Sequence, residues 1–117
     1  MPAPSPLKIA TQAVSRLATE EKYYQKELSS QTTRIQKLET DLKNGNGADN
    51  NAEFMLKQEQ KALEETKAVF GPLKQRSTEA TQRLEEQIAT VEGDQDVNQE
   101  ELAKAKEILA SAPKEDA

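Results

Sequence analysis

The feature that most constrains this chain is a regular spacing of apolar residues along two long stretches, at alternating steps of three and four. In the first stretch the apolar or small residues at this spacing are Leu7, Ala10, Val14, Leu17, Tyr24, Leu28, Ile35, Leu38 and Leu42. Polar residues interrupt the series at Glu21 and Gln31. Residues three and four apart lie on one face of an α-helix, so the spacing predicts a long amphipathic helix.

The first helix is expected at residues 6–44. Ser5 can accept a hydrogen bond from a free backbone N–H, and Pro6 at the first helical position loses a donor that has no partner there. The run ends in the sequence Asn44-Gly45-Asn46-Gly47, whose residue types adopt the positive φ that closes a helix. A helix of about 38 residues is roughly 57 Å long.

A second helix is expected at residues 50–92. Asn50 with Glu53 three residues later has the spacing of a capping box. The apolar series resumes with Leu56, Leu63, Thr66, Phe70, Leu73, Ala80, Leu84 and Val91. Four further apolar residues lie beside this series and widen the apolar face of the helix, namely Met55, Ala62, Val69 and Ile88.

Gly71-Pro72 lies in the middle of this second stretch. A proline inside a helix removes one hydrogen bond and clashes with the preceding turn, so two helices that meet here are one interpretation. The other is a single helix kinked at Pro72, which the unbroken spacing from Leu63 to Leu84 favours because a loop would normally reset it.

A third, shorter helix is expected at residues 98–112. Gly93 ends the second helix, and Asn98 with Glu101 repeats the capping-box spacing. The apolar positions of this helix are Leu102, Ala105, Ile108, Leu109 and Ala112. Pro113 stops it, and the tail that follows is expected to be loose.

These helices predict an all-α fold, an elongated antiparallel three-helix bundle that forms one domain over residues 1–117, because short connections force neighbouring helices to run antiparallel. Residues 1–44 carry a net charge of +2 and residues 94–117 a net charge of −4, which favours contact between the first and third helices. The exposed faces also offer pairs at i, i+4, namely Glu39/Lys43, Glu53/Lys57, Glu79/Arg83 and Glu100/Lys104. The third helix or another chain can cover the apolar faces, so a monomer and a weak homodimer both stay open.

Composition excludes several classes of function. Leu, Ile, Val and Phe make up only 18 % of the chain, but Ala, Glu, Lys, Leu and Arg make up about half, which with this periodicity is typical of long helices. The chain has no Cys and no His, so neither a thiolate nucleophile nor the usual general base is present, and we expect no enzyme, metal site or cofactor. The net charge of −5 disfavours nucleic acid, and no segment is apolar enough to cross a membrane. We therefore expect a soluble, intracellular binding module.

The first helix also carries a pattern that resembles the tubulin-binding cofactor A family. The pattern is Lys8-Ile9-x-Thr11-x-x-Val14-x-Arg16-Leu17-x-x-Glu20-x-x-x-Tyr24-x-Lys26-Glu27, followed by a polar turn and a second helix with Pro72 before Gln75-Arg76. The likeness covers roughly residues 7–91. It implies a three-helix bundle, with Pro72 at the position where the family kinks its second helix.

The resemblance further implies a tubulin-folding chaperone of the cytoplasm and cytoskeleton. Such a protein binds β-tubulin folding intermediates after chaperonin release and passes them to other tubulin-folding cofactors, without ATP. A structural or trafficking coiled-coil adaptor is the alternative. The absence of a core Trp speaks against a spectrin-type repeat, and the short connection between the long helices speaks against a prefoldin-type subunit.

Candidate partner-binding residues lie on the first helix. Because this helix is basic and tubulin is acidic, we expect cations there to contact the partner, namely Lys22, Lys26, Arg34 and Lys37. Tyr24 falls on the apolar series, and Tyr23 lies beside it. Tyr23 is either an apolar anchor for a partner or a cover for the edge of the apolar face.

Overall fold

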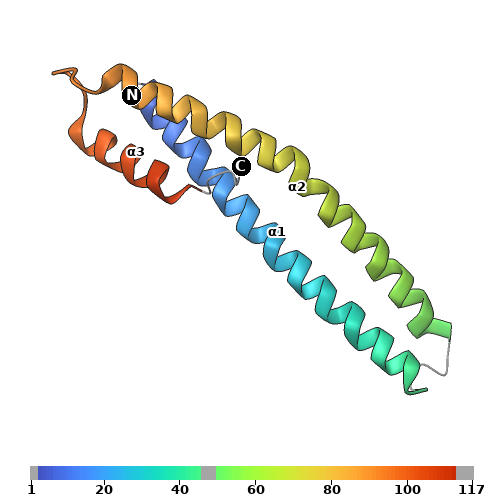
Figure 1. The fold of residues 1–117 in the computed structure, drawn as a ribbon. Helices are drawn as coiled ribbons and strands as arrows, with labels where there is room; N and C mark the ends of the chain where they lie inside the picture. Colours follow the sequence, from blue (N-terminus) through green and yellow to red (C-terminus); the bar gives the residue numbers. More distant parts are fainter. Residues whose placement is uncertain (1–2, 46–49, 113–117) are drawn as a thin grey trace. The chain divides into compact units, whose positions relative to one another are not determined.

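The structure, a computed structural model, describes residues 3–45 and 50–112 (Figure 1). Three helices make up this part of the chain, α1 (Pro6–Lys43), α2 (Asn50–Val91) and α3 (Gln99–Ser111), and it contains no strand. The all-α, three-helix prediction is confirmed. The expected turn residues Asn46 and Gly47, the cap by the Asn50 side chain, and the stop at Pro113 with its tail lie outside what is described.

The helix ends follow from local chemistry at the expected residues. Ser5 Oγ accepts a hydrogen bond from the backbone N–H of Lys8 at 3.1 Å, which satisfies one free donor of the first turn of α1. After α1, Gly45 has a φ of 77°, and after α2, Gly93 has a φ of 91°. Glycine adopts this left-handed conformation without a Cβ clash, so both glycines allow the chain to leave the helix.

The helix α2 continues through Pro72 without a break. The interpretation that two separate helices meet at Gly71-Pro72 is therefore wrong. The proline removes the bond to the carbonyl of Ala68, and Ala68, Gly71 and Pro72 are all exposed. Water can therefore reach the carbonyl that loses its donor, which is the physical reason that the helix tolerates the proline here.

The chain divides into two compact units, which we name by their helices. The three-helix unit comprises Met1–Glu20 and Leu73–Ala117, with the first part of α1, the second part of α2 and all of α3. The two-helix unit, Glu21–Pro72, comprises the remaining parts of α1 and α2. That residues 1–117 act as one domain stays a prediction.

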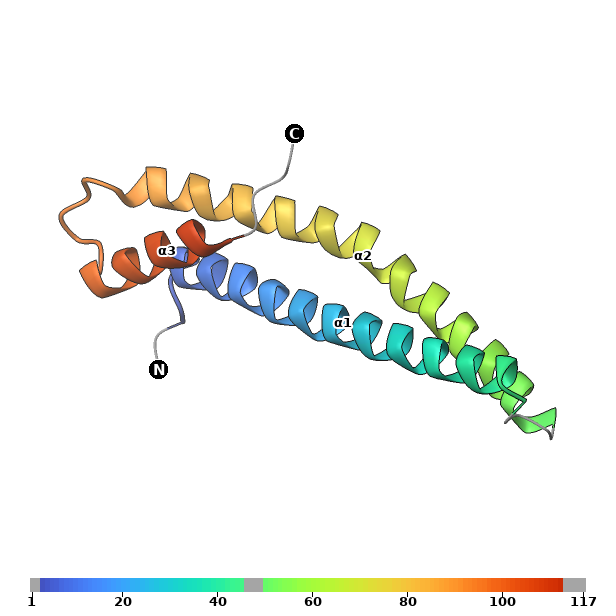
Figure 2. The same ribbon diagram turned by 60° about the horizontal axis from the view of Figure 1, so that its bottom comes forward.

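The three-helix unit has a core of buried apolar residues to which all three helices contribute. Its buried apolar residues are Leu7, Ala10, Val14, Leu17, Leu73, Ala80, Leu84, Ile88, Leu102, Ala105 and Ala112. Leu84 and Ala105 are completely inaccessible to solvent. Figure 2 shows α3 beside the first turns of α1 and the last turns of α2. All these residues belong to the predicted apolar series.

One helix cap and two hydrogen bonds to neighbouring segments involve α3 in this unit. Asn98 caps the helix by accepting from the backbone N–H of Glu101 at 3.1 Å. The Glu101 carboxylate does not close the expected box but accepts a hydrogen bond from Ser5 Oγ at 2.7 Å. Lys106 Nζ donates to Glu92 at 2.7 Å and so joins α3 to the end of α2. The Ser5–Glu101 bond agrees with the expected contact between the first and third helices.

In the two-helix unit the same apolar spacing is covered less completely. Its buried residues are Gln31, Ile35 and Thr66, whereas most of the predicted apolar positions are half-buried. Leu28 is half-buried and not a core residue. Met55, expected at the edge of the buried face, is 46 % exposed, and Phe54 beside it is 60 % exposed. The expectation that Leu28 and Met55 are buried is therefore wrong. The reason is that two antiparallel helices cover only part of each other's apolar face.

The ion pairs also differ from the expected i, i+4 series. Within residues 3–45 and 50–112, none of the four pairs predicted from spacing is formed. The ion pairs present are Arg34–Glu27, Arg34–Glu59, Lys67–Glu64, Lys104–Glu107 and Lys106–Glu92. Exposed pairs of this kind contribute little stability, so the spacing alone does not select a partner.

Candidate functional site

The five candidate residues all lie on α1 in the two-helix unit, and all five are exposed. They are Lys22, Tyr23, Lys26, Arg34 and Lys37. The structure separates them into three groups with different surroundings, although the sequence had grouped them by charge and exposure alone.

Three of the lysines share one outward face of α1. Lys22 and Lys26 are one turn apart, and the same face continues in steps of three or four to Lys37. Hydroxyl residues fill the positions between and beyond them, all exposed, namely Ser29, Ser30, Thr33 and Thr40. We call these seven residues the lysine face. It contains no carboxylate.

The lysine face points away from the contact with α2. The residues that α1 buries in this unit are Gln31 and Ile35, which lie on the opposite side of the helix. A partner can therefore approach the lysines without opening the pair of helices. The hydroxyl residues continue the spacing of the lysines in the sequence, but they carry no charge, so the charge pattern did not indicate them.

Arg34 has a different environment from the lysines. Its Nε donates to Glu59 Oε1 at 3.0 Å across the two helices, and its Nη2 lies 3.6 Å from Glu27 Oε1. Two carboxylates already surround this guanidinium, so its charge is largely compensated within the protein. Arg34 joins α1 to α2, and its proposed contact with a partner competes with that role.

Tyr23 and Tyr24 differ in exposure, although Tyr24 is less buried than its place in the apolar series predicts. Tyr24 is half-buried, and Tyr23 is 61 % exposed. The two rings are in an edge-to-face arrangement with their centroids 5.1 Å apart. This contact holds the exposed ring in a defined position beside Lys22 and Lys26, where it presents apolar surface next to the two charges.

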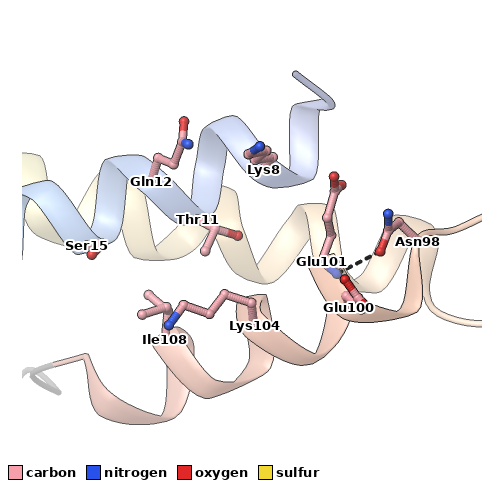
Figure 3. A pocket seen from close by; sticks show the side chains of 9 residues that line it. All are labelled: Lys8, Thr11, Gln12, Ser15, Asn98, Glu100, Glu101, Lys104 and Ile108. Atoms are coloured by element: carbon pink, nitrogen blue, oxygen red, sulfur yellow. Dashed lines mark hydrogen bonds between the residues drawn. The ribbon is translucent and has the colours of Figure 1, made fainter. Parts of the chain in front are cut away.

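A second surface feature, a groove between α1 and α3 in the three-helix unit, was not foreseen (Figure 3). Its volume is about 440 Å³, and α1 lines it with Lys8, Thr11, Gln12 and Ser15. From α3 and its cap come Asn98, Glu100, Glu101, Lys104 and Ile108. No sequence pattern marks this groove, because its two walls are about 90 residues apart in the chain.

The groove carries charges of both signs that are partly satisfied within the protein. Glu101 accepts from Ser5, and Lys104 lies 3.9 Å from Glu107. The Thr11 hydroxyl donates to the carbonyl of Leu7 at 2.8 Å. Three polar side chains of the groove therefore already have partners in the protein, and these partners lie outside its lining.

Residues 3–45 and 50–112 contain no group of three potential metal ligands. In this part of the chain, none of the helices has the length and apolar character needed to cross a membrane.

Comparison with known proteins decides the family. A sequence model described as tubulin binding cofactor A matches residues 2–109, nearly the whole chain. The chain belongs to the tubulin binding cofactor A family. The match includes nearly all of α3, which extends the family likeness beyond the region around residues 7–91 that the motifs of the first two helices indicated.

A curated relative supports this membership. The chain is 33 % identical over 111 residues to tubulin-specific chaperone A of Saccharomyces cerevisiae (strain ATCC 204508 / S288c), and the alignment covers 93 % of this chain and 98 % of the relative. No solved structure matches the chain. Because the cofactor A match covers all three helices, the family assignment applies to both units and not to one helix alone.

Proposed function

We propose that this protein is a tubulin-folding chaperone that binds β-tubulin folding intermediates after chaperonin release and passes them on for assembly of the α/β-tubulin heterodimer. The observation that carries the proposal is the family match over residues 2–109, together with the identity to a tubulin-specific chaperone over almost its whole length. The proposed place of action is the cytoplasm, in association with the cytoskeleton.

The proposed mechanism is binding without chemistry. The outer face of α1 contacts the client through Lys22, Lys26, Arg34 and Lys37, with Tyr23 as an apolar anchor. A protein that binds one state of its client favours that state by RT ln(1 + [L]/Kd), so neither ATP nor a metal ion is needed. Release follows when another tubulin-folding cofactor competes for the client. The protein acts in this scheme as a monomer or a weak homodimer.

Capture of β-tubulin tests the proposal directly. The full chain is mixed with chaperonin-released β-tubulin or with folded tubulin heterodimer, and the bound fraction is measured by pull-down. We expect capture of the released β-tubulin without ATP. Failure to bind any tubulin species, with binding to a trafficking coiled coil instead, would leave the adaptor function in its place.

A four-cation variant tests the proposed surface. Replacing Lys22, Lys26, Arg34 and Lys37 by Ala should leave the helical circular dichroism signal intact and weaken the capture of β-tubulin. The salt dependence of capture should also become flatter, because fewer charges take part. Undiminished capture by this variant would move the client site to α2 or α3.

We also propose that α2 bends at Pro72. The missing hydrogen bond to the Ala68 carbonyl and the clash of the proline ring with that turn support a bend, and both groups are exposed and free to adjust. Pro72→Ala restores the bond and removes the clash, so the variant should be as stable as the parent or more stable. Unfolding of the variant would show that the chain requires a turn at this position.

A further inference from the structure

Lys22 and Lys26 carry positive charge that pairs with no carboxylate among the described residues. On a helix the neighbours of a side chain are the residues three and four positions away. For Lys22 and Lys26, those neighbours are Ala18, Thr19, Tyr23, Gln25, Ser29 and Ser30, together with each other. None is a carboxylate. Among the described residues, neither lysine nor Lys37 forms an ion pair, although Asp41 lies four positions after Lys37.

The lysines of α2 in the same unit provide the contrast. Lys57 has Glu53 four positions before it, and Lys61 has Glu64 and Glu65 after it. Lys67 lies 3.6 Å from Glu64. Carboxylates thus lie three or four positions from these lysines of α2, whereas none lies at those positions from Lys22 or Lys26 on α1.

The arrangement on α1 is unfavourable for the isolated protein. Like charges four positions apart on a helix repel each other, and this is the relation between Lys22 and Lys26. The chain has 21 acidic residues against 16 basic ones, so carboxylates are abundant elsewhere. Helix stability therefore does not explain this pair of lysines, which presents exposed positive charge to a partner.

From these observations we propose that the lysine face binds a stretch of polypeptide rich in Asp and Glu. Lysines are flexible point charges that suit carboxylates on a mobile segment. The exposed hydroxyls of Ser29 and Ser30 lie between the lysines and donate hydrogen bonds to carboxylate or backbone oxygens. Lys22 and Lys37 are 15 positions apart, which on a helix is about 22 Å and corresponds to about seven residues of extended peptide.

Other polyanions fit this face less well. Single-stranded nucleic acid is bound through a positive groove with several aromatic rings on which successive bases stack, whereas the lysine face is a convex helix surface with one exposed ring, Tyr23, at its edge. An anionic membrane surface is bound by helices that bury an apolar face, and every member of the lysine face is polar or charged. The acidic peptide is thus the partner that the residues match best.

This inference rests on the proposed function for the natural partner, an acidic segment of the tubulin client. The chemistry of the site is tested separately with a fluorescent peptide of eight glutamates and the full chain at low salt. We expect saturable binding by fluorescence anisotropy. The triple variant Lys22→Gln, Lys26→Gln, Lys37→Gln should weaken it at least tenfold.

A matched variant controls for net charge. Lys57→Gln, Lys61→Gln, Lys67→Gln removes the same three charges from α2 of the same unit, and it should change the affinity less than twofold. Equal losses in the two triple variants would overturn the inference, because only the net charge would then matter. Absence of peptide binding by the parent chain would overturn it as well.

A single inserted carboxylate provides a second, independent variant. Ser29→Glu places a negative charge between the lysines and should weaken peptide binding at least threefold, whereas Gln60→Glu on α2 should not. Helix content by circular dichroism confirms that both variants fold. If the triple variant fails to fold, the comparison of Ser29→Glu with Gln60→Glu tests the site instead. An equal effect of these two substitutions on peptide affinity rejects the site.

Competition assigns the class of partner. Concentrations of the competitors are expressed per negative charge. On that scale an unlabelled glutamate peptide should displace the fluorescent peptide at a lower concentration than single-stranded RNA or vesicles that contain phosphatidylserine. Stronger displacement by RNA or vesicles would overturn the assignment to an acidic polypeptide.

The inference and the proposed function fail in different ways. Capture of β-tubulin by a chain that does not bind the glutamate peptide would overturn the inference and leave the function. Binding of the peptide by a chain that captures no tubulin would support the site and reject the function.

Discussion

The three-helix unit and the two-helix unit both contain parts of α1 and α2 with the same apolar spacing, yet they bury their residues to different degrees. In the three-helix unit Leu84 is fully inaccessible and Leu73 is 1 % exposed. In the two-helix unit the corresponding positions are mostly half-buried, and Ile35, at 8 % exposure, is its only apolar residue in the described part of the chain that counts as buried. The spacing identifies the face of each helix that points inward. The number of helices packed against that face decides how completely its residues are buried.

Both units also bury polar side chains. In the three-helix unit the buried Thr11 hydroxyl donates to the Leu7 carbonyl at 2.8 Å. In the two-helix unit Gln31 is 4 % exposed, and its Oε1 has no hydrogen-bond partner among the described residues. A buried acceptor without a donor destabilises the fold. In the three-helix unit Ser77 Oγ likewise has no partner among the described residues, so the two units differ in how apolar their cores are and not in this respect.

The largest expected effect is in the core of the three-helix unit. Leu84→Ala leaves a cavity at a position with no solvent exposure, so it should lower the free energy of unfolding by about 2–5 kcal/mol. Urea denaturation followed by circular dichroism measures the change. A loss below about 1 kcal/mol would show that the third helix does not close this core in solution.

The matched substitution in the two-helix unit should have a smaller effect. Leu28 is half-buried, so Leu28→Ala removes less buried surface and should cost about 1–2 kcal/mol. The same denaturation experiment, done at two protein concentrations, checks this. A loss equal to that of Leu84→Ala, and dependent on concentration, would indicate that a second chain covers the two-helix unit.

Gln31 provides a substitution that should stabilise the protein. Gln31→Leu replaces a buried acceptor without a described partner by an apolar side chain of similar size, and should raise the free energy of unfolding by about 1 kcal/mol. Gln36→Leu at an exposed position of the same helix is the control and should change it by less than about 0.5 kcal/mol. Destabilisation by Gln31→Leu would mean that the amide is bonded in solution.

The smallest expected effect concerns the ion pair between the two helices. Arg34→Gln removes the contact with Glu59, and because both side chains are partly exposed the loss should be about 0.5 kcal/mol. The difference from the parent should vanish in about 1 M salt, where exposed charges are screened. A difference that persists at high salt would show that packing of the arginine stem, and not its charge, joins the helices.

The sequence by itself determined the helices and their boundaries. Ser5, Gly45, Gly93 and Asn98 act within a few residues of their own positions, so the types of residue were sufficient to place the starts of α1 and α3 and the ends of α1 and α2. The steps of three and four likewise identified which side of each helix faces inward. These are local properties of the chain, and local rules describe them well.

Only the tertiary structure decided burial and partnership. It determined that Leu28 is half-buried while Leu84 is inaccessible, because the difference depends on whether a third helix is present. It also separated Arg34, which pairs with Glu59, from the lysine face, which has no such partner. The sequence was thus sufficient to find the candidate cations. It was not sufficient to show which of them carry charge that no carboxylate compensates. Contacts between residues far apart in the chain decide that question, and a pattern along one helix does not contain them.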